Sequence, residues 1–385
     1  MQEKIKKGLF IFLMLVILAP LAEQSTNFIH SMKLSGAYTT ALEPEFNFED
    51  WWSGKFQEAK SKSLNDQVGF RPDFVRINNQ IDYSLFSKLH FSYGVLGKNN
   101  TIWDGAYIDA YQGYDFIGHD TILKRAYKLK KVQDTLQKLG KTLVLVNAPN
   151  KAFFYPEYLP ENRIHNERLP TNEETYVKIA DSIGLNQIDF NGWFIQLRKT
   201  SKEILYTRQG IHWSTFGSAL GADSLIKYLE NIRKEPMQHI AWNVIEHSTT
   251  PRFVDNDLAS TTNLITPICV ENMAYPQIIY PNSTTAHKPK IIFIGDSFLC
   301  QFLCLGIMDN IYQDWNIWFY FRTLCNNQNP YGDPNAKKIK DIDWKADLMK
   351  TDCIVLLYTA FNLPHLGDGF IEQSYDYFYP QNQAK

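Results

Sequence analysis

Two short polar turns in the sequence carry residues that together could transfer an acyl group. In "IIFIGDSFLC", Ser297 follows an apolar run and Gly295, a residue that permits a sharp turn. In "TRQGIHWSTFG", His212 occupies a similar turn. A serine hydroxyl becomes an effective nucleophile when a histidine accepts its proton, so the pair predicts covalent acyl transfer. The alternative is that Asp296 or Ser297 only caps the next helix and that His212 is a structural histidine.

Such a site also needs hydrogen-bond donors for the negative charge that develops on the reacting carbonyl oxygen. Backbone N–H groups at the start of a helix can donate, which suits Ser297 and the turn at Gly295. Arg322 in "FYFRTLCNN" and Asn362 in "YTAFNLP" follow apolar strands, and we expect them at the same rim unless their role is structural. Lys151 and Tyr155 are further candidates for this rim. The alternative for Tyr155 is that its ring packs inside the protein.

The elements that position these residues alternate between strands and helices. Amphipathic or capped segments predict helices at 122–139, at 172–183 and from about 214 onward. Apolar runs predict strands in "KTLVLVNAP", "NQIDF", "EILYTRQ", "KPKIIFIG", "WNIWFYF" and "DCIVLLYT". This alternation predicts an α/β sheet, mostly parallel, with helices on both faces. Ligands bind such sheets beyond the carboxyl ends of the strands, where the residues named above would lie.

The N-terminal 24 residues predict a signal anchor or a signal peptide. Three lysines precede an apolar run at 9–22, so the basic flank should stay in the cytoplasm while the rest of the chain is exported. The run has the length of a signal-peptide core. Pro20 would stand three residues before a cleavage site after Ala22, which favours an uncleaved anchor in the cytoplasmic membrane.

Composition limits the remaining possibilities. With 385 residues, 44% of them hydrophobic, the chain can form one large or two ordinary domains. We expect a linker at 25–45 and one domain at 46–385, with 46–120 as a helical and hairpin extension packed on it. The net charge of -2, without a basic tract beyond the N-terminus, argues against nucleic-acid binding. Five cysteines without a CxxC pair indicate neither a metal site nor a disulfide framework.

The motifs, in their order, resemble a known family. "WWSGKFQEAKSKSLNDQVGFRP", "GVLGKNNTIWDGAYIDAYQG", "NAPNKAFFYPEYLP", "GIHWSTFG" and "IGDSF" are similar to segments of the SGNH-like O-acetyltransferases of the alginate O-acetyltransferase AlgJ/AlgX type. His212 precedes Ser297 here, as in this permuted family, whereas ordinary SGNH hydrolases have the serine first. The resemblance implies a three-layer α/β/α fold, a polysaccharide acceptor, no cofactor and no metal. It also implies an integral-membrane acyltransferase partner that supplies acetyl groups.

One position departs from the family pattern Asp-x-His-Trp, because Gly210 stands where the aspartate is expected. That acid should orient the imidazole and stabilise its charged form. Either another acid replaces it, or the site works as a serine–histidine dyad, or it is impaired. "RFVDNDLAST" offers Asp255 and Asp257, of which we favour Asp257 as the replacement; the alternative is that both are turn or cap residues.

The sequence thus predicts an extracytoplasmic O-acetyltransferase that acts on a cell-surface or exported polysaccharide through a Ser297 acyl-enzyme. Two alternatives remain at this point. A carbohydrate acetyl esterase would use the same residues with water as the acceptor. A non-catalytic polysaccharide-binding or assembly protein would retain the fold alone, and Gly210 is the feature that favours it.

Overall fold

A computed structural model describes residues 2–26, 28–36, 40–91, 93–164, 167–281 and 285–380. The chain divides into two compact units, each described here by itself. The first comprises Met1–Ser92 with Ala259–Ile268, and the second comprises Tyr93–Leu258 with Cys269–Lys385. The predicted boundaries at 24 and 45 and the predicted extension at 46–120 stay predictions.

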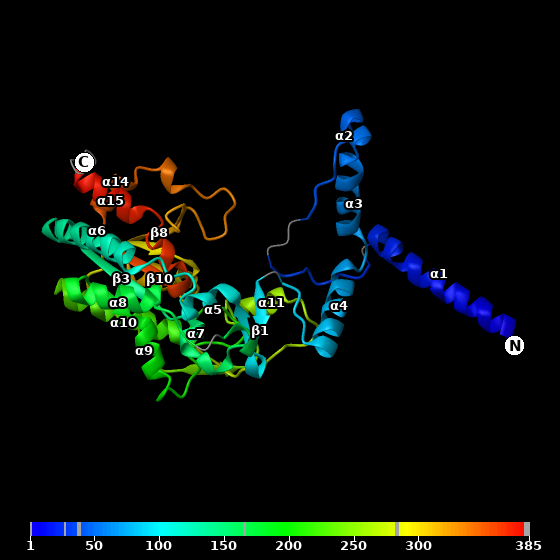
Figure 1. Cartoon of the computed structure of the whole chain (residues 1–385), viewed down its shortest axis with the longest axis horizontal. Coiled ribbons are helices and arrows are strands. Elements are labelled where there is room, and N and C mark those ends of the chain that lie inside the picture. The colour runs from blue at the N-terminus through cyan, green and yellow to red at the C-terminus, as the bar shows by residue number, and fades with distance from the viewer. Residues whose placement is uncertain are drawn as a thin grey trace. The chain divides into compact units, whose positions relative to one another are not determined.

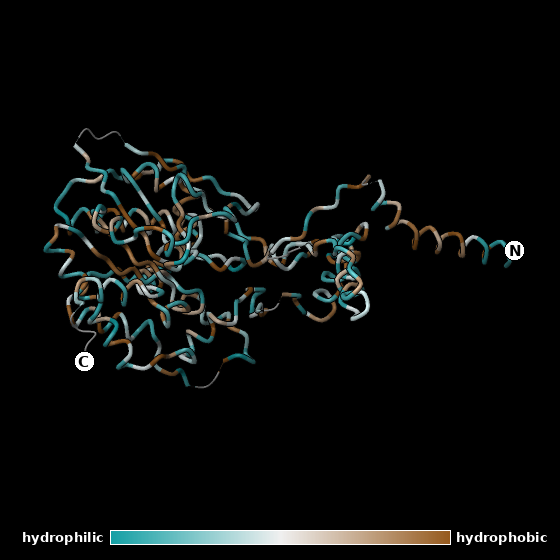
Figure 2. Tube along the Cα trace, turned by 90° about the horizontal axis from the view of Figure 1, so that it is seen from above, coloured by the Kyte–Doolittle hydropathy of each residue, from teal (hydrophilic) through white to brown (hydrophobic). Residues whose placement is uncertain are grey.

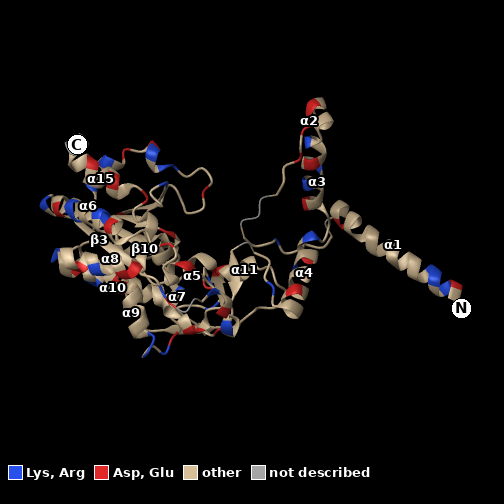
Figure 3. Ribbon diagram, in the orientation of Figure 1, with Lys and Arg blue, Asp and Glu red and all other residues tan. Residues whose placement is uncertain are grey.

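The first unit is helical. It contains α1 (Gln2–Thr26), α2 (Phe48–Ser53), α3 (Lys55–Gln67) and α4 (Arg71–Phe86). Helix α1 is apolar over most of its length (Figure 2) and carries its basic residues at the N-terminal end (Figure 3). Among the described residues, α1 is the one helix long and apolar enough to cross a membrane, and a signal sequence has the same features.

Two breaks separate the last three helices of this unit. One break, at Gly69, lies between α3 and α4, and Pro72 is accommodated in the first turn of α4. A second break falls at Gly54, whose φ of 84° ends α2 in the left-handed conformation that glycine adopts readily. Helix α4 also binds the returning segment, since the Asn79 side-chain amide donates to the Thr262 carbonyl at 2.9 Å.

The second unit is organised around a six-stranded sheet in the order β4-β3-β10-β7-β8-β9. All neighbouring strands are parallel except the edge pair β8–β9, so the predicted, mostly parallel α/β sheet is confirmed. Its strands are β3 (Thr142–Ala148), β4 (Gln187–Asp189), β7 (Lys290–Gly295), β8 (Asp314–Phe319), β9 (Thr323–Cys325) and β10 (Cys353–Thr359). Two antiparallel pairs lie outside this sheet: β1 (Gly94–Leu96) with β2 (Ile102–Asp104), and β5 (Ile245–Ser248) with β6 (Met273–Pro276).

Helices cover both faces of the sheet because side chains of a buried parallel strand point alternately to each side. On β7, Phe293 faces one apolar cluster while Ile292 and Ile294 face the other. The first cluster is built with α9 (Phe190–Leu197), α10 (Thr215–Arg233), α12 (Cys300–Cys304) and α13 (Ile307–Ile311). The second is built with α6 (His119–Lys138), α8 (Asn172–Ile183), α14 (Trp344–Lys350) and α15 (Phe370–Phe378), and α6 and α15 lie side by side (Figure 1).

Short elements complete the unit at the edges of the sheet. The remaining α-helices are α5 (Gly105–Gln112), α7 (Lys151–Phe154) and α11 (Asp257–Thr261), of which α11 runs across the boundary between the two units. The 3₁₀ helices are η1 (Lys98–Asn100), η2 (Pro156–Tyr158), η3 (Glu161–Arg163), η4 (Ser297–Leu299), η5 (Ile339–Asp341) and η6 (Ala360–His365).

Most sequence-based elements are present, but the predicted strand in "EILYTRQ" is wrong. This segment doubles back on itself: Tyr206 forms an isolated bridge with Trp213, and the Ser214 N–H donates to the Leu205 carbonyl at 3.0 Å. The apolar pattern that suggested a strand instead reflects burial of Leu205 and Tyr206 in the core beneath the turn.

Candidate active site

The candidate nucleophile leaves the sheet directly after β7. Gly295 is required there because a Cβ at this position would lie 2.1 Å from the Leu357 carbonyl oxygen on β10. Asp296 then caps η4, accepting the Phe298 N–H at 3.1 Å, and Ser297 is the first residue of that 3₁₀ helix. Asp296 is therefore the helix cap, which leaves the Ser297 hydroxyl available for another partner.

That partner is His212. Its Nε2 lies 2.8 Å from Ser297 Oγ, and its Nδ1 lies 2.5 Å from Asp257 Oδ2. His212 is 6% exposed, whereas Ser297 is partly open. The structure thus brings together, in one chain of hydrogen bonds, the serine, the histidine and the acid that the sequence singled out. In this arrangement Nδ1–H donates to the carboxylate and Nε2 accepts the serine proton.

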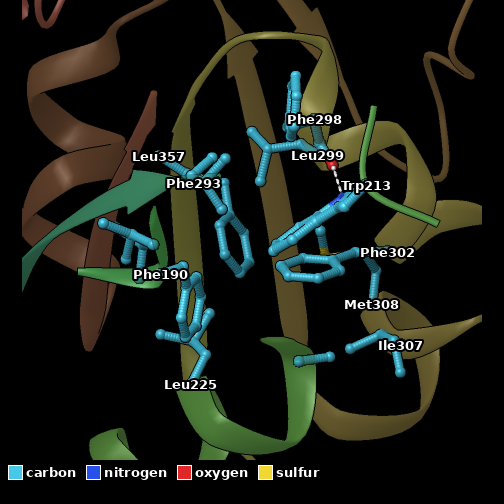
Figure 4. Packing of buried hydrophobic residues seen from close by; sticks show 14 of the residues in the cluster. Phe190, Trp213, Leu225, Phe293, Phe298, Leu299, Phe302, Ile307, Met308 and Leu357 are labelled. Carbon is cyan, nitrogen blue, oxygen red and sulfur yellow. Dashed lines mark hydrogen bonds between the residues drawn. The ribbon is translucent and has the colours of Figure 1, made fainter. Parts of the chain in front are cut away.

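The residue after the histidine fixes the turn to the core. Trp213 is fully buried, and its Nε1 donates to the Phe298 carbonyl at 3.3 Å, as the dashed line in Figure 4 marks. The indole lies against the phenyl ring of Phe302 and against Gly221, where a Cβ would approach it to 2.7 Å. The tryptophan of the His-Trp motif therefore connects the His212 turn to the helix that follows Ser297.

The two acids at 255 and 257 have different partners. Asp257 Oδ1 also accepts the Ile211 N–H at 2.7 Å, so this carboxylate holds the histidine turn at two points. Asp255 instead accepts the Thr215 N–H and hydroxyl, both at 2.9 Å, and the Gln301 amide at 3.3 Å. Burial raises the pKa of Asp255 to about 6. Asp255 therefore anchors the segment, and Asp257 is the acid in contact with the imidazole.

The two predicted rim residues beyond β8 and β10 lie elsewhere. The Asn362 amide donates to Asp296 Oδ2 at 2.8 Å, and the same oxygen accepts the N–H and hydroxyl of Thr359 at 2.8 and 3.0 Å. Asn362 thus fixes the residue before the serine. Arg322 is exposed; burial raises the pKa of the nearby Asp368 carboxyl, and the charge of Arg322 opposes part of that rise.

A residue that the sequence did not suggest, Tyr320, reaches Ser297. Tyr320 and Ser297 line the same cavity, and polar groups of Ser297 are close enough to the phenol to act on its pKa. Burial, with the negative charge of Asp296 as a further cause, raises the pKa of Tyr320 to about 12, so the phenol keeps its proton at neutral pH. Tyr320 and Phe321 have φ values of 50° and 48°, and this tight turn between β8 and β9 directs the phenol. A Tyr-Phe pair carries no sequence signal for positive φ.

A cavity of about 330 Å³ opens beside Ser297. Its lining combines the β8–β9 hairpin, including Phe319, Tyr320 and Leu324, with the segment 330–338. The Tyr331 ring of that segment lies 5.1 Å from the Phe319 ring, centroid to centroid. The volume is at the lower end of the roughly 300–1,000 Å³ found for pockets that hold small molecules.

The other two candidates, Lys151 and Tyr155, are not at the rim. Lys151 is 1% exposed, and its Nζ donates to three backbone carbonyls, those of Ile102, Arg208 and Gly210. The Tyr155 hydroxyl donates to the Tyr206 carbonyl at 2.8 Å. Both side chains therefore support the His212 turn from within the protein.

Comparison with known proteins finds similarity to acetyltransferases. Residues 117–300 match the family model of the SGNH hydrolase-like domain of the acetyltransferase AlgX, a segment that contains both His212 and Ser297. This segment, a little under half of the chain, is therefore similar to the AlgJ/AlgX family. A probable alginate O-acetylase AlgJ of Pseudomonas syringae is 24% identical over 173 residues, which are 45% of this chain and 42% of that relative, so less than half of the relative is matched.

Solved structures from two Pseudomonas species are also similar to this AlgJ/AlgX-like chain. The O-acetyltransferase domain of Pseudomonas putida AlgJ has 16% identity and a TM-score of 0.49, with 74% of this chain and 100% of that chain covered. Pseudomonas aeruginosa AlgX has 11% identity and a TM-score of 0.46, with 74% of this chain and 71% of that chain covered.

The departure at Gly210 has a structural explanation in this AlgJ/AlgX-like domain. A Cβ on Gly210 would lie 2.9 Å from Thr207 Cγ2 and 3.0 Å from the carbonyl oxygens of Val254 and Asp255. A larger side chain at 210 would therefore require the segment that delivers Asp257 to move. The absence of a side chain at Gly210 thus leaves room for the backbone at 254 and 255, just before Asp257.

Proposed function

We propose that this protein is an extracytoplasmic O-acetyltransferase that moves acetyl groups onto hydroxyls of a cell-surface or exported polysaccharide. The observation that carries the proposal is the hydrogen-bonded chain from Asp257 through His212 to Ser297 at the carboxyl end of β7. The alternative of a non-catalytic protein rested on Gly210, because no acid at that position can orient the histidine. Asp257 contacts His212 instead, so Gly210 no longer favours that alternative.

In the first half of the reaction, His212 Nε2 takes the proton of the Ser297 hydroxyl as Oγ attacks the acetyl carbonyl of the donor. The negative charge on the carbonyl oxygen is stabilised by the Ser297 N–H and by the Tyr320 hydroxyl. The bond between the acetyl carbon and the donor breaks, and the leaving group receives the proton from His212. Asp257 stabilises the imidazolium that forms in between.

In the second half, a sugar hydroxyl gives its proton to His212 and its oxygen attacks the acetyl-serine. The new ester bond forms as the bond to Ser297 Oγ breaks, and the serine recovers its proton from the imidazolium. The cavity beside Ser297, of about 330 Å³, is consistent with a sugar acceptor, because an acetyl group alone would fill only a small part of it.

The N-terminal unit and the family resemblance support a proposal for the location and the acetyl donor. We infer that α1 anchors the chain in the cytoplasmic membrane, with the second unit on the extracytoplasmic side. An integral-membrane acyltransferase would then supply the acetyl group at the same membrane. None of the steps above requires a cofactor or a metal ion.

The test separates transfer from hydrolysis. The purified chain is given an activated acetyl ester with and without a neutral oligosaccharide, and acetylated sugar and free acetate are both measured. We expect the oligosaccharide to receive acetyl in preference to water, and Ser297→Ala and His212→Ala to abolish both products. Acetate as the sole product in the presence of oligosaccharide would instead establish the acetyl esterase.

A further inference from the structure

Lys151 is a buried cation whose place the proposed reaction does not explain. It is the first residue of α7, directly after the Asn150 cap that follows β3. Its Nζ donates to the Ile102 carbonyl at 2.6 Å and to the Arg208 and Gly210 carbonyls at 2.8 Å each. The face of the Trp103 ring lies 5.3 Å from the same atom. Three N–H donors of an ammonium group thus meet three acceptors.

Burial of an ammonium group is costly, so a fully buried lysine needs complete hydrogen bonding. Here burial lowers the pKa of Lys151 to about 7, although the charges of Glu271 and Asp257 favour the protonated form. The cost is incurred at an irregular turn, in which Tyr206 bridges Trp213 and the Arg208 carbonyl accepts the Ile102 N–H of β2 at 3.0 Å. Lysine adds a second donor to the Arg208 carbonyl and supplies a donor to the Gly210 carbonyl.

The turn in question leads to His212. Lys151 holds the carbonyls at 208 and 210, the Tyr206 hydroxyl donates to the Ile211 carbonyl, and Asp257 accepts the Ile211 N–H. The peptide groups just before the histidine are therefore fixed by side chains. A small displacement of the imidazole would lengthen its bond to Ser297 Oγ, and errors of about 1 Å at such a group can cost 10²-fold in rate.

We propose that Lys151 is a positioning residue, which sets the imidazole of His212 by clamping the carbonyls of Arg208 and Gly210. The proposal rests on the proposed function of His212 as the base. It assigns to Lys151 an effect on the chemical step rather than on substrate binding, since the ammonium group is enclosed by protein atoms. Replacement by an apolar side chain of similar length should then lower kcat and leave KM nearly unchanged.

The test compares Lys151→Met with Lys141→Met. Lys141 is a matched control, because its Nζ also donates to a backbone carbonyl, that of Thr351 at 2.6 Å, but at the opposite end of β3. For each folded variant we measure the melting temperature, kcat and KM for an activated acetyl ester, and the rate at which a sulfonyl fluoride labels Ser297. The temperature of the assays lies well below the melting temperature of every variant.

We expect Lys151→Met to lower kcat and the labelling rate by roughly 10–100-fold with KM within about twofold, and Lys141→Met to keep both rates within about twofold. Equal rates in Lys151→Met and the wild type would overturn the proposal. If Lys151→Met does not fold, Lys151→Gln, which keeps two donors, is judged by the same criteria. Failure of both to fold would make the lysine purely structural and would also overturn it. No labelling of the wild type would contradict the proposed function itself.

Discussion

At the scale of single residues, the proposed reaction requires Asp257, because Gly210 stands where the family pattern has its aspartate. Asp257→Asn retains the shape of the side chain but removes the charge that stabilises the imidazolium of His212. We expect kcat/KM for the acetyl ester to fall by roughly 10²–10⁴-fold. Asp255→Asn is the matched control, two residues away and bonded to Thr215, and should keep most of the activity. Equal losses in the two variants would show that neither acid acts on the histidine.

Asp255 also provides a test by pH. Its pKa is about 6 in the folded protein against an ordinary value of 3.8, so the folded state holds a proton that the unfolded state releases between these values. Stability from this group is therefore present below pH 3.8 and lost as the pH rises to 6, by about 3 kcal/mol in all. Asp255→Asn has no such loss. Its melting temperature relative to the wild type should rise between pH 4 and pH 7, and a difference that is constant with pH would contradict this assignment.

At the scale of the elements, the turn between β8 and β9 brings Tyr320 to the serine. Tyr320→Phe keeps the ring and the turn but removes the hydroxyl that we propose as an oxyanion donor in the cavity beside Ser297. We expect acyl-enzyme formation to slow by roughly 10–10³-fold, the range for loss of one oxyanion donor. Tyr280→Phe, which loses a hydroxyl bonded to the Leu305 carbonyl, is the control and should react at the wild-type rate. A wild-type rate in Tyr320→Phe would contradict a role for Tyr320 as an oxyanion donor.

The elements that could be predicted from the sequence are those whose own residue pattern indicates burial or a turn. The continuous apolar runs of β3, β7 and β10 predicted buried parallel strands, and the polar turn after β7 located Ser297. His212 was located by the polar turn after "EILYTRQ", although that segment is not a strand. Asp257 was proposed because Gly210 left an acid missing. Neither the hydrogen bonds of Lys151 to the carbonyls of Arg208 and Gly210 nor the two positive φ values of Tyr320 and Phe321 could be predicted, since both depend on contacts distant in sequence.

At the scale of the whole molecule, the proposed location depends on whether α1 is a membrane anchor. We expect the full-length protein to sit in the membrane fraction, to resist extraction by high salt, and to retain its N-terminal residues. If α1 is the membrane anchor, a chain that begins at residue 28 should be lost from the membrane fraction, because α1 is removed. A mature N-terminus just after Ala22 would instead identify α1 as a cleaved signal peptide.

The central claim is that Ser297 carries the acetyl group. The most direct measurement is mass spectrometry of the chain after brief exposure to an activated acetyl ester in the absence of an acceptor. We expect one added acetyl group on the peptide that contains Ser297, and we expect this group to be lost when a sugar acceptor is added. The acetyl-serine should form slowly in His212→Ala and not at all in Ser297→Ala. An unmodified Ser297 in a wild-type chain that still turns over the ester would contradict it.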